Sequence, residues 1–189
     1  MPIKIFIDPG HNPKTNAGAE GFGFTEQDIT YDIGNILYDL LKGDYRFEVM
    51  ISRKSKDEVI ATNQSTSLIN RVEQANKFDA DYFLSIHCNA NENQNINGSE
   101  IYVYNRYTQA YYLAEIILKE ITENLKTKNN GVKINKSFYV LRKTKMPALL
   151  IELAYITNYE DLKKLTANGF DFAFSIYLGL LSYFDLQKL

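Results

Sequence analysis

The sequence is poor in cysteine and contains no long apolar run. One cysteine among 189 residues, Cys88, excludes an internal disulfide, which suits synthesis in a reducing compartment. No apolar stretch approaches the length of about 20 residues that spans a bilayer, so we expect no membrane span. The first residues pass directly into a strand-like run, without the basic, apolar and small-residue regions of a signal peptide. We therefore expect no export signal in this sequence.

A surplus of basic residues is also missing. The formal net charge is −2, and the 21 lysines and arginines are dispersed along the chain. A nucleic-acid-binding domain usually has a concentrated basic face, so we expect no nucleic-acid partner. The composition, 45% hydrophobic and 23% charged, is that of a globular protein. No linker or repeat divides the chain, which predicts a single domain over residues 1–189.

Short apolar runs alternate with segments of helical periodicity. Buried strands separated by helices are typical of a sheet covered by helices on both faces. The sequence therefore predicts an α/β fold with a single twisted, mostly parallel or mixed sheet of about six strands covered by helices. The expected strands are residues 3–7, 47–51, 82–86, 148–153 and 100–104, and the expected helices are residues 25–42, 67–77, 108–125 and 170–184. Asn130 and Gly131 are expected to close the third helix, and Asn158 with Asp161 to cap another.

The chain has only two histidines, and each lies beside a predicted buried strand. His11 follows the first strand and the turn at residues 8–10, and His87 follows the strand at residues 82–86. Ligands of open α/β sheets bind beyond the carboxyl ends of the strands, so both imidazoles should project into one crevice. There they can share a metal ion. Each histidine taken alone also fits a hydrogen-bonded core or loop residue.

A catalytic zinc site needs a third protein ligand and an open coordination position. Glu26 is the best candidate, because the Gly-rich loop at residues 18–23 can carry it back beside His11. By spacing alone, a capping or helix-dipole role explains Glu26 more economically. Glu20 is a competing ligand.

Glu152 lies in the middle of an apolar run. A buried carboxylate must pair, bind a metal ion or have a raised pKa, which suits a general base. The alternative is a structural salt bridge, with Arg142 or Arg71 as partner, and the sequence does not separate the two readings. Cys88, one residue after His87, should point to the opposite face of its strand as a small buried side chain.

Several segments occur in a fixed order between residue 3 and about residue 165, notably 5–11 (IFIDPGH), 85–90 (SIHCNA) and 147–152 (PALLIE). Together they resemble the zinc-dependent N-acetylmuramoyl-L-alanine amidases of the type 3 family, which include sporulation-associated mother-cell lytic amidases and phage endolysin catalytic domains. The further matching segments are residues 18–19, 26–28, 71–72, 75–76, 80–81, 98–100, 140–142 and 157–158.

The resemblance implies a sheet of the zinc hydrolase and exopeptidase type, in one catalytic amidase domain over residues 1–189 with no separate wall-binding domain. It also implies that His11, Glu26 and His87 bind one zinc ion and that Glu152 is the catalytic glutamate. It would thereby select Glu26 over Glu20. The implied substrate is peptidoglycan, cut at the amide bond between N-acetylmuramic acid and L-alanine of the stem peptide. Zinc would activate water and polarise the carbonyl, and Glu152 would transfer protons.

One departure concerns the loop after the first histidine. The family usually has Gly-Gly there, whereas this chain has Asn12 and Pro13. The ligand itself is kept, but the loop should differ in shape.

Three other functions compete with this interpretation. A zinc metallopeptidase acting on stem peptides would use the same kind of scaffold, but a two-metal site needs more histidines than this chain has. A non-catalytic wall-binding module would be expected to lose Glu152 or a ligand. A helix-rich interaction protein without a metal leaves the placement of both histidines unexplained. Without an export signal, we expect synthesis in the cytoplasm and action on the wall after lysis or phage-mediated release. If a leader precedes this sequence, we expect secretion. The sequence does not identify an activating partner or self-association.

Overall fold

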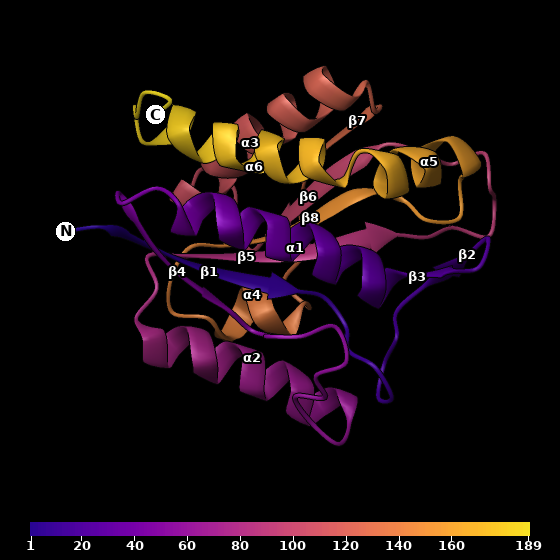
Figure 1. Cartoon of the computed structure of the whole chain (residues 1–189), viewed down its shortest axis with the longest axis horizontal. Helices are drawn as coiled ribbons and strands as arrows, with labels where there is room; N and C mark the ends of the chain where they lie inside the picture. Colours follow the sequence, from indigo (N-terminus) through magenta and orange to yellow (C-terminus); the bar gives the residue numbers. More distant parts are fainter.

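A six-stranded mixed sheet forms the centre of the molecule, in a computed structural model that describes residues 1–189 (Figure 1). The strand order is β4-β1-β5-β8-β6-β7. Neighbours pair in parallel except β6 and β8, which are antiparallel. A separate small hairpin is formed by β2 and β3. The strands are β1 (Ile3–Pro9), β2 (Glu20–Gly21), β3 (Phe24–Thr25), β4 (Phe47–Ile51), β5 (Tyr82–Asn89), β6 (Ser99–Val103), β7 (Asn129–Ile134) and β8 (Ala148–Tyr155).

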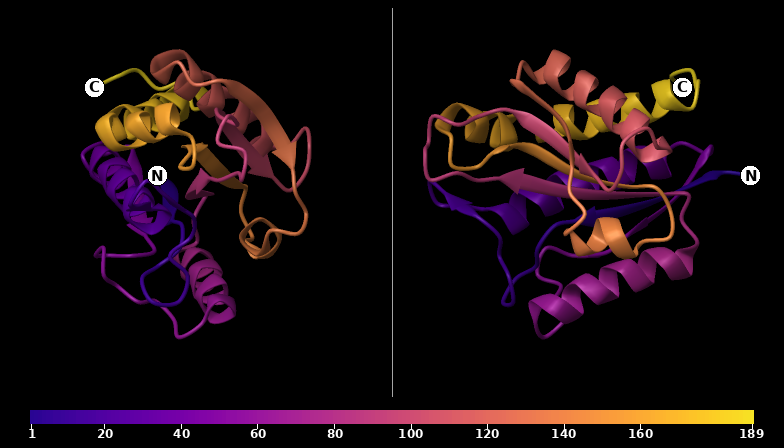
Figure 2. Two further views of the ribbon diagram at one scale, coloured as in Figure 1. Left: turned by 90° about the vertical axis from the view of Figure 1, so that its right-hand side faces the viewer. Right: turned by 180° about the vertical axis from the view of Figure 1, so that it is seen from behind.

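Helices cover both faces of the sheet, as Figures 1 and 2 show from different sides. One face carries α1, α3, α5 and α6 over a core cluster of 34 buried residues, whereas the other carries α2 and α4 over only 9. The thinner layer leaves room for the cavity described below. The helices are α1 (Glu26–Lys42), α2 (Gln64–Phe78), α3 (Gln109–Leu125), α4 (Tyr139–Lys143), α5 (Tyr159–Ala167) and α6 (Gly169–Tyr183).

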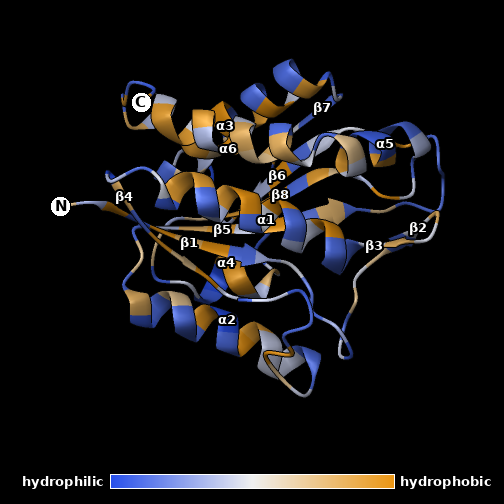
Figure 3. Cartoon of the chain, in the orientation of Figure 1, coloured by the Kyte–Doolittle hydropathy of each residue, from blue (hydrophilic) through white to orange (hydrophobic).

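Helical periodicity explains how α1 packs. Ile29, Ile33, Leu37 and Leu41 recur at four-residue intervals and are all buried against the sheet. In Figure 3, α1 and α2 show both hydrophobic and hydrophilic residues, whereas α6 is hydrophobic over most of the length seen in this view. No helix combines the length and the apolar character needed to cross a membrane.

The structure confirms the α/β sheet and corrects several details. Asn130 and Gly131 do not close α3; they lie in β7, because Lys126 adopts a left-handed conformation (φ 53°) that ends the helix at Leu125. His87 lies within β5 and not after it, since that strand continues to Asn89. The hairpin β2–β3 and the short helix α4 are additions that the pattern did not predict.

Candidate metal centre

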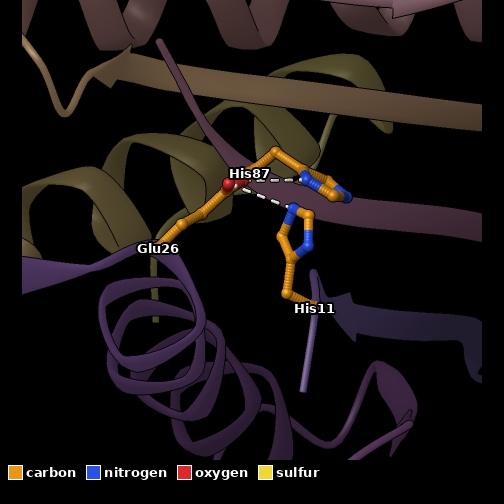
Figure 4. A group of neighbouring side chains, drawn as sticks. All are labelled: His11, Glu26 and His87. Carbon is orange, nitrogen blue, oxygen red and sulfur yellow. Dashed lines mark hydrogen bonds and ion pairs between the residues drawn. The ribbon is translucent and has the colours of Figure 1, made fainter. Parts of the chain in front are cut away.

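Three elements bring His11, Glu26 and His87 together at the carboxyl edge of the sheet (Figure 4). His11 follows β1, Glu26 is the first residue of α1, and His87 extends from β5. One potential ligand atom from each side chain lies within 4.8 Å of the others. Glu20, the competing carboxylate, is exposed on β2 and lies outside this cluster. The expected convergence of the two imidazoles and Glu26 is therefore present in the structure.

Glu26 lies between the two imidazoles. Its Oε2 is 3.0 Å from Nε2 of His11, and its Oε1 is 3.0 Å from Nδ1 of His87. Two backbone amides also donate to the carboxylate, Ala19 N to Oε2 and Cys88 N to Oε1, each at 2.9 Å. Burial by itself raises the pKa of Glu26, but the hydrogen bonds and charges of the two histidines outweigh it and hold the pKa well below its ordinary range. The carboxylate is thus ionised and oriented.

The donor set fits a divalent metal ion. Two imidazoles and one carboxylate are a common ligand set of catalytic zinc sites, which keep a fourth position open. The imidazoles are each 18% exposed and the carboxylate 5%, so the cluster is shielded but reachable. The buried Nδ1 of His11 has no hydrogen-bond partner, unlike the nitrogens of a histidine that serves only to fill a core.

Two glycines make this close approach sterically feasible. A Cβ on Gly10 would lie 2.5 Å from the His87 ring, and a Cβ on Gly18 would lie 2.4 Å from Oε2 of Glu26. Gly18 also has a positive φ of 78°, which other residues rarely adopt. The Gly-rich loop therefore does more than supply flexibility, because it passes directly against the cluster.

A buried network holds the backbone of His11 in place. His11 itself has a positive φ of 63°, a conformation that needs support from its surroundings. Arg71 on α2 donates to the carbonyl oxygens of His11 and Pro9 and pairs with Asp8. Asp8 also accepts from Ser52 at 2.7 Å and Ser85 at 2.9 Å. The sequence interpretation missed this role of Asp8, although a carboxylate ending an apolar strand was its visible signal.

Asn12 explains how the loop accommodates the departure from Gly-Gly. Its side chain is buried, donates to Ser67 Oγ at 3.1 Å and accepts from Thr15 Oγ1 at 2.7 Å. The loop is thereby fastened to α2 at the residue after His11.

Glu152 lies on β8 in register with His87 on the adjacent strand. Neither proposed partner neutralises it, because Arg71 pairs with Asp8 and Arg142 is exposed with no ion pair. Its buried Oε2 has no hydrogen-bond partner. Burial, followed by the charges of Glu26 and Glu100, raises the pKa of Glu152 well above its ordinary value. The structural salt bridge considered for this residue is therefore wrong.

A cavity of about 360 Å³ joins Glu152 to the three-residue cluster. It is lined by the cluster and Glu152, by the polar side chains Gln64, Ser67 and Arg71 of α2, and by the apolar or aromatic side chains Leu68, Phe138 and Tyr139. Cys88 is buried in the core, and burial raises the pKa of its thiol, which agrees with the expected packing role. A cavity of this size with convergent polar groups is typical of a site for a small molecule or a segment of substrate.

The chain belongs to the N-acetylmuramoyl-L-alanine amidase family, whose sequence profile matches residues 5–182. This confirms the predicted family and the predicted enzyme class. The chain is 37% identical over 186 residues to the amidase LytC of Bacillus subtilis, covering 95% of this chain. It is 36% identical over 192 residues to the amidase CwlM of Bacillus licheniformis, covering 98% of this chain.

The fold agrees with the same family. The structure of the amidase AmiC2 of Nostoc punctiforme superposes with a TM-score of 0.86 at 33% sequence identity, covering 97% of each chain. This chain spans 35% of the length of LytC and 70% of the length of CwlM.

Proposed function

We propose that this chain is a zinc-dependent amidase that hydrolyses the bond between the lactyl group of N-acetylmuramic acid and L-alanine of the stem peptide in peptidoglycan. The observation that carries the proposal is one cavity containing both the cluster of His11, Glu26 and His87 and the unpartnered carboxyl of Glu152. The family to which the chain belongs supports the same bond.

His11, Glu26 and His87 would hold one zinc ion. Zinc bound there would polarise the scissile carbonyl and lower the pKa of water toward about 7. Glu26 supplies the negative charge of the ligand set, and its four hydrogen-bonding neighbours fix both of its oxygens. The ligand atoms are therefore largely arranged before a metal ion arrives.

Glu152 would carry the protons of the reaction. As general base it takes a proton from the attacking water, and as general acid it returns one to the leaving amine of L-alanine. A raised pKa suits both roles, because it makes the ionised carboxylate a better proton acceptor and lets the neutral carboxyl keep a proton to return. Its unpartnered Oε2 leaves it free to bond to the reacting groups.

The substrate places the action of this chain at the bacterial cell wall. Release after lysis or through a phage-made lesion, or secretion, remains a prediction about the route.

The test is the mass of the products released from purified peptidoglycan by metal-free, zinc-reloaded and Glu152→Ala protein. We expect zinc-dependent release of intact stem peptides with a free N-terminal L-alanine, and none from Glu152→Ala. Cuts within the stem peptide would identify a metallopeptidase instead, and zinc-independent binding without products would identify a wall-binding module.

A further inference from the structure

Arg53 is fully buried two residues beyond the end of β4 (Phe47–Ile51), and it is the largest side chain with no exposed surface. It forms no ion pair, and its Nε has no hydrogen-bond partner. Burial, with a smaller contribution from Arg71, lowers its pKa to about 10, although the charges of Asp8 and Asp28 oppose this shift, so the guanidinium remains charged at neutral pH. A buried charge without a counter-ion is costly, and a hydrophobic side chain of similar length would normally stabilise the fold better.

The contacts of Arg53 are with the backbone beside the metal-binding residues. Its Nη2 donates to the carbonyl oxygen of Gln27 at 2.8 Å and, more weakly, to that of Gly10 at 3.5 Å. Gly10 directly precedes His11, and Gln27 directly follows Glu26. A second donor reinforces the same junction, since Thr30 Oγ1 donates to the carbonyl oxygen of Gly10 at 2.9 Å.

Two further contacts fix the guanidinium. Its Nη1 donates to the carbonyl oxygen of Lys56 at 3.0 Å, and its central carbon lies 5.2 Å from the ring centroid of Tyr31. Three carbonyls and an aromatic face thus take the place of a carboxylate around Arg53.

The three members of the cluster differ in how firmly their own elements hold them. His87 lies in β5, a central strand paired on both sides. His11 lies in a loop with a positive φ, and Glu26 lies at the junction between a two-residue strand and α1. The two residues in need of external support are the two that Arg53 connects.

We propose that Arg53 is a positioning residue that holds the segments of His11 and Glu26 at the separation a metal ion requires. This rests on the metal centre of the proposed function. Without Arg53 the carbonyls of Gly10 and Gln27 would lose the donor they share, and at Gly10 only the hydrogen bond from Thr30 would link the two segments. Metal binding would then have to supply more of the free energy that orders them.

The test compares zinc affinity with the stability of the metal-free protein. Arg53→Met removes every hydrogen bond and keeps most of the volume, whereas Arg53→Lys keeps the charge but cannot span two carbonyls. Arg46→Met is the matched control, because Arg46 is a largely buried arginine that pairs with Asp44. Zinc dissociation constants are measured by competition with a chelating dye at a temperature where every variant is folded, and unfolding temperatures are measured without metal.

We expect Arg53→Met to weaken zinc binding by about 10- to 100-fold, as for other residues that support metal ligands, and Arg53→Lys to fall between it and wild type. Arg46→Met should lower the unfolding temperature and leave zinc affinity unchanged. Wild-type zinc affinity in Arg53→Met, or an equal loss in Arg46→Met, would overturn the inference. If Arg53→Met does not fold, Arg53→Lys decides by the same criterion.

The outcome is separable from that of the proposed function. If wild type and His87→Ala bind zinc equally weakly, the metal centre itself is wrong. If wild type binds zinc tightly and His87→Ala does not, but Arg53→Met matches wild type, only the role of Arg53 is wrong.

Discussion

The parallel strands of the sheet begin at its amino edge and finish at its carboxyl edge. Each of these two edges buries a carboxylate, but the two carboxylates differ in their hydrogen-bond partners. At the amino edge, Asp44 lies between α1 and β4, and each of its oxygens is occupied. It accepts from Arg46 Nε at 2.8 Å and Nη2 at 2.5 Å and from the Tyr177 hydroxyl at 3.0 Å. The hydrogen bonds from Arg46 hold the pKa of Asp44 below its ordinary value, although burial opposes them.

At the carboxyl edge, Glu152 has an oxygen without any partner and a raised pKa. The negative charges of Glu26 and Glu100 raise the pKa of Glu152 further. A buried carboxyl whose oxygens are all hydrogen-bonded is compatible with a stable fold, whereas one without partners destabilises the fold. Such an unpartnered carboxyl is found mainly at functional sites. The comparison teaches that burial of a carboxyl does not by itself mark proton-transfer chemistry; Glu152 differs from Asp44 because one of its oxygens has no partner.

The largest effect should come from removing a ligand at the carboxyl edge. His87→Ala should abolish amide hydrolysis and weaken zinc binding by more than about 100-fold, beyond the cost of losing a supporting residue. Zinc at about 100 times its dissociation constant should stabilise wild type by about 2.7 kcal/mol, and it should not stabilise His87→Ala. Calorimetric titration and thermal unfolding with and without zinc measure both quantities.

Cys88→Ala is the control, since the thiol lies beside His87 in the chain but is buried in the core. It should bind zinc as wild type does. Equal loss in both variants would mean that disruption of β5, and not removal of a ligand, causes the defect.

The second effect separates chemistry from metal binding. Glu152→Gln keeps the shape of the side chain but cannot accept a proton from water, so hydrolysis should fall by about 10²- to 10⁴-fold. Zinc affinity should stay close to that of wild type. Single-turnover rates on a muropeptide, measured beside zinc titrations, provide the test; near-normal rates would exclude Glu152 from proton transfer.

The central sheet could be predicted because its strands are apolar on both faces, as residues 82–86 and 148–153 show. Edge strand β7 (NNGVKI) could not, since an exposed edge needs no apolar run and its Asn and Gly favour a helix end when taken locally. A capping role for Asn158 was predictable, and its side chain accepts from Asp161 N as expected.

The candidate site divides in the same way. His11 and His87 were predictable from their places at strand ends, and their rings do meet at 4.9 Å between centroids. The role of Glu26 as a ligand could not be predicted from spacing, because an acidic residue in the first turn of a helix can also act as a cap. Its location beside His11 depends on the path of the loop at Gly18, which packs against both residues. The bracing by Arg53 depends on contacts across 26 and 43 residues of sequence, which no local pattern contains.

A smaller effect should appear at the amino edge. Asp44→Asn leaves Arg46 and the Tyr177 hydroxyl without their charged acceptor, so the unfolding temperature of the metal-free protein should fall by roughly 2–8 °C. Zinc affinity and hydrolysis measured below that temperature should be unchanged. A loss of zinc affinity as well would break the comparison, because it would show that the two edges are energetically coupled.

The smallest effect, and the one that sharpens the comparison most, is the opposite pH dependence of the two carboxyls in metal-free protein. The folded-state pKa of Asp44 is lowered, so its contribution to stability is present above the unfolded-state pKa and is lost as pH falls through the folded-state pKa. The folded-state pKa of Glu152 is raised, so folding favours its neutral form, and that contribution is complete below the unfolded-state pKa and lost as pH rises through the folded-state pKa. Unfolding temperatures are measured in the presence of a chelator. The unfolding temperature of Asp44→Asn should approach that of wild type only in acid. That of Glu152→Gln should rise relative to wild type, by a few degrees at most, as the pH increases. Curves of the same sign for both variants would show that Glu152 has a partner when folded and is as structural as Asp44.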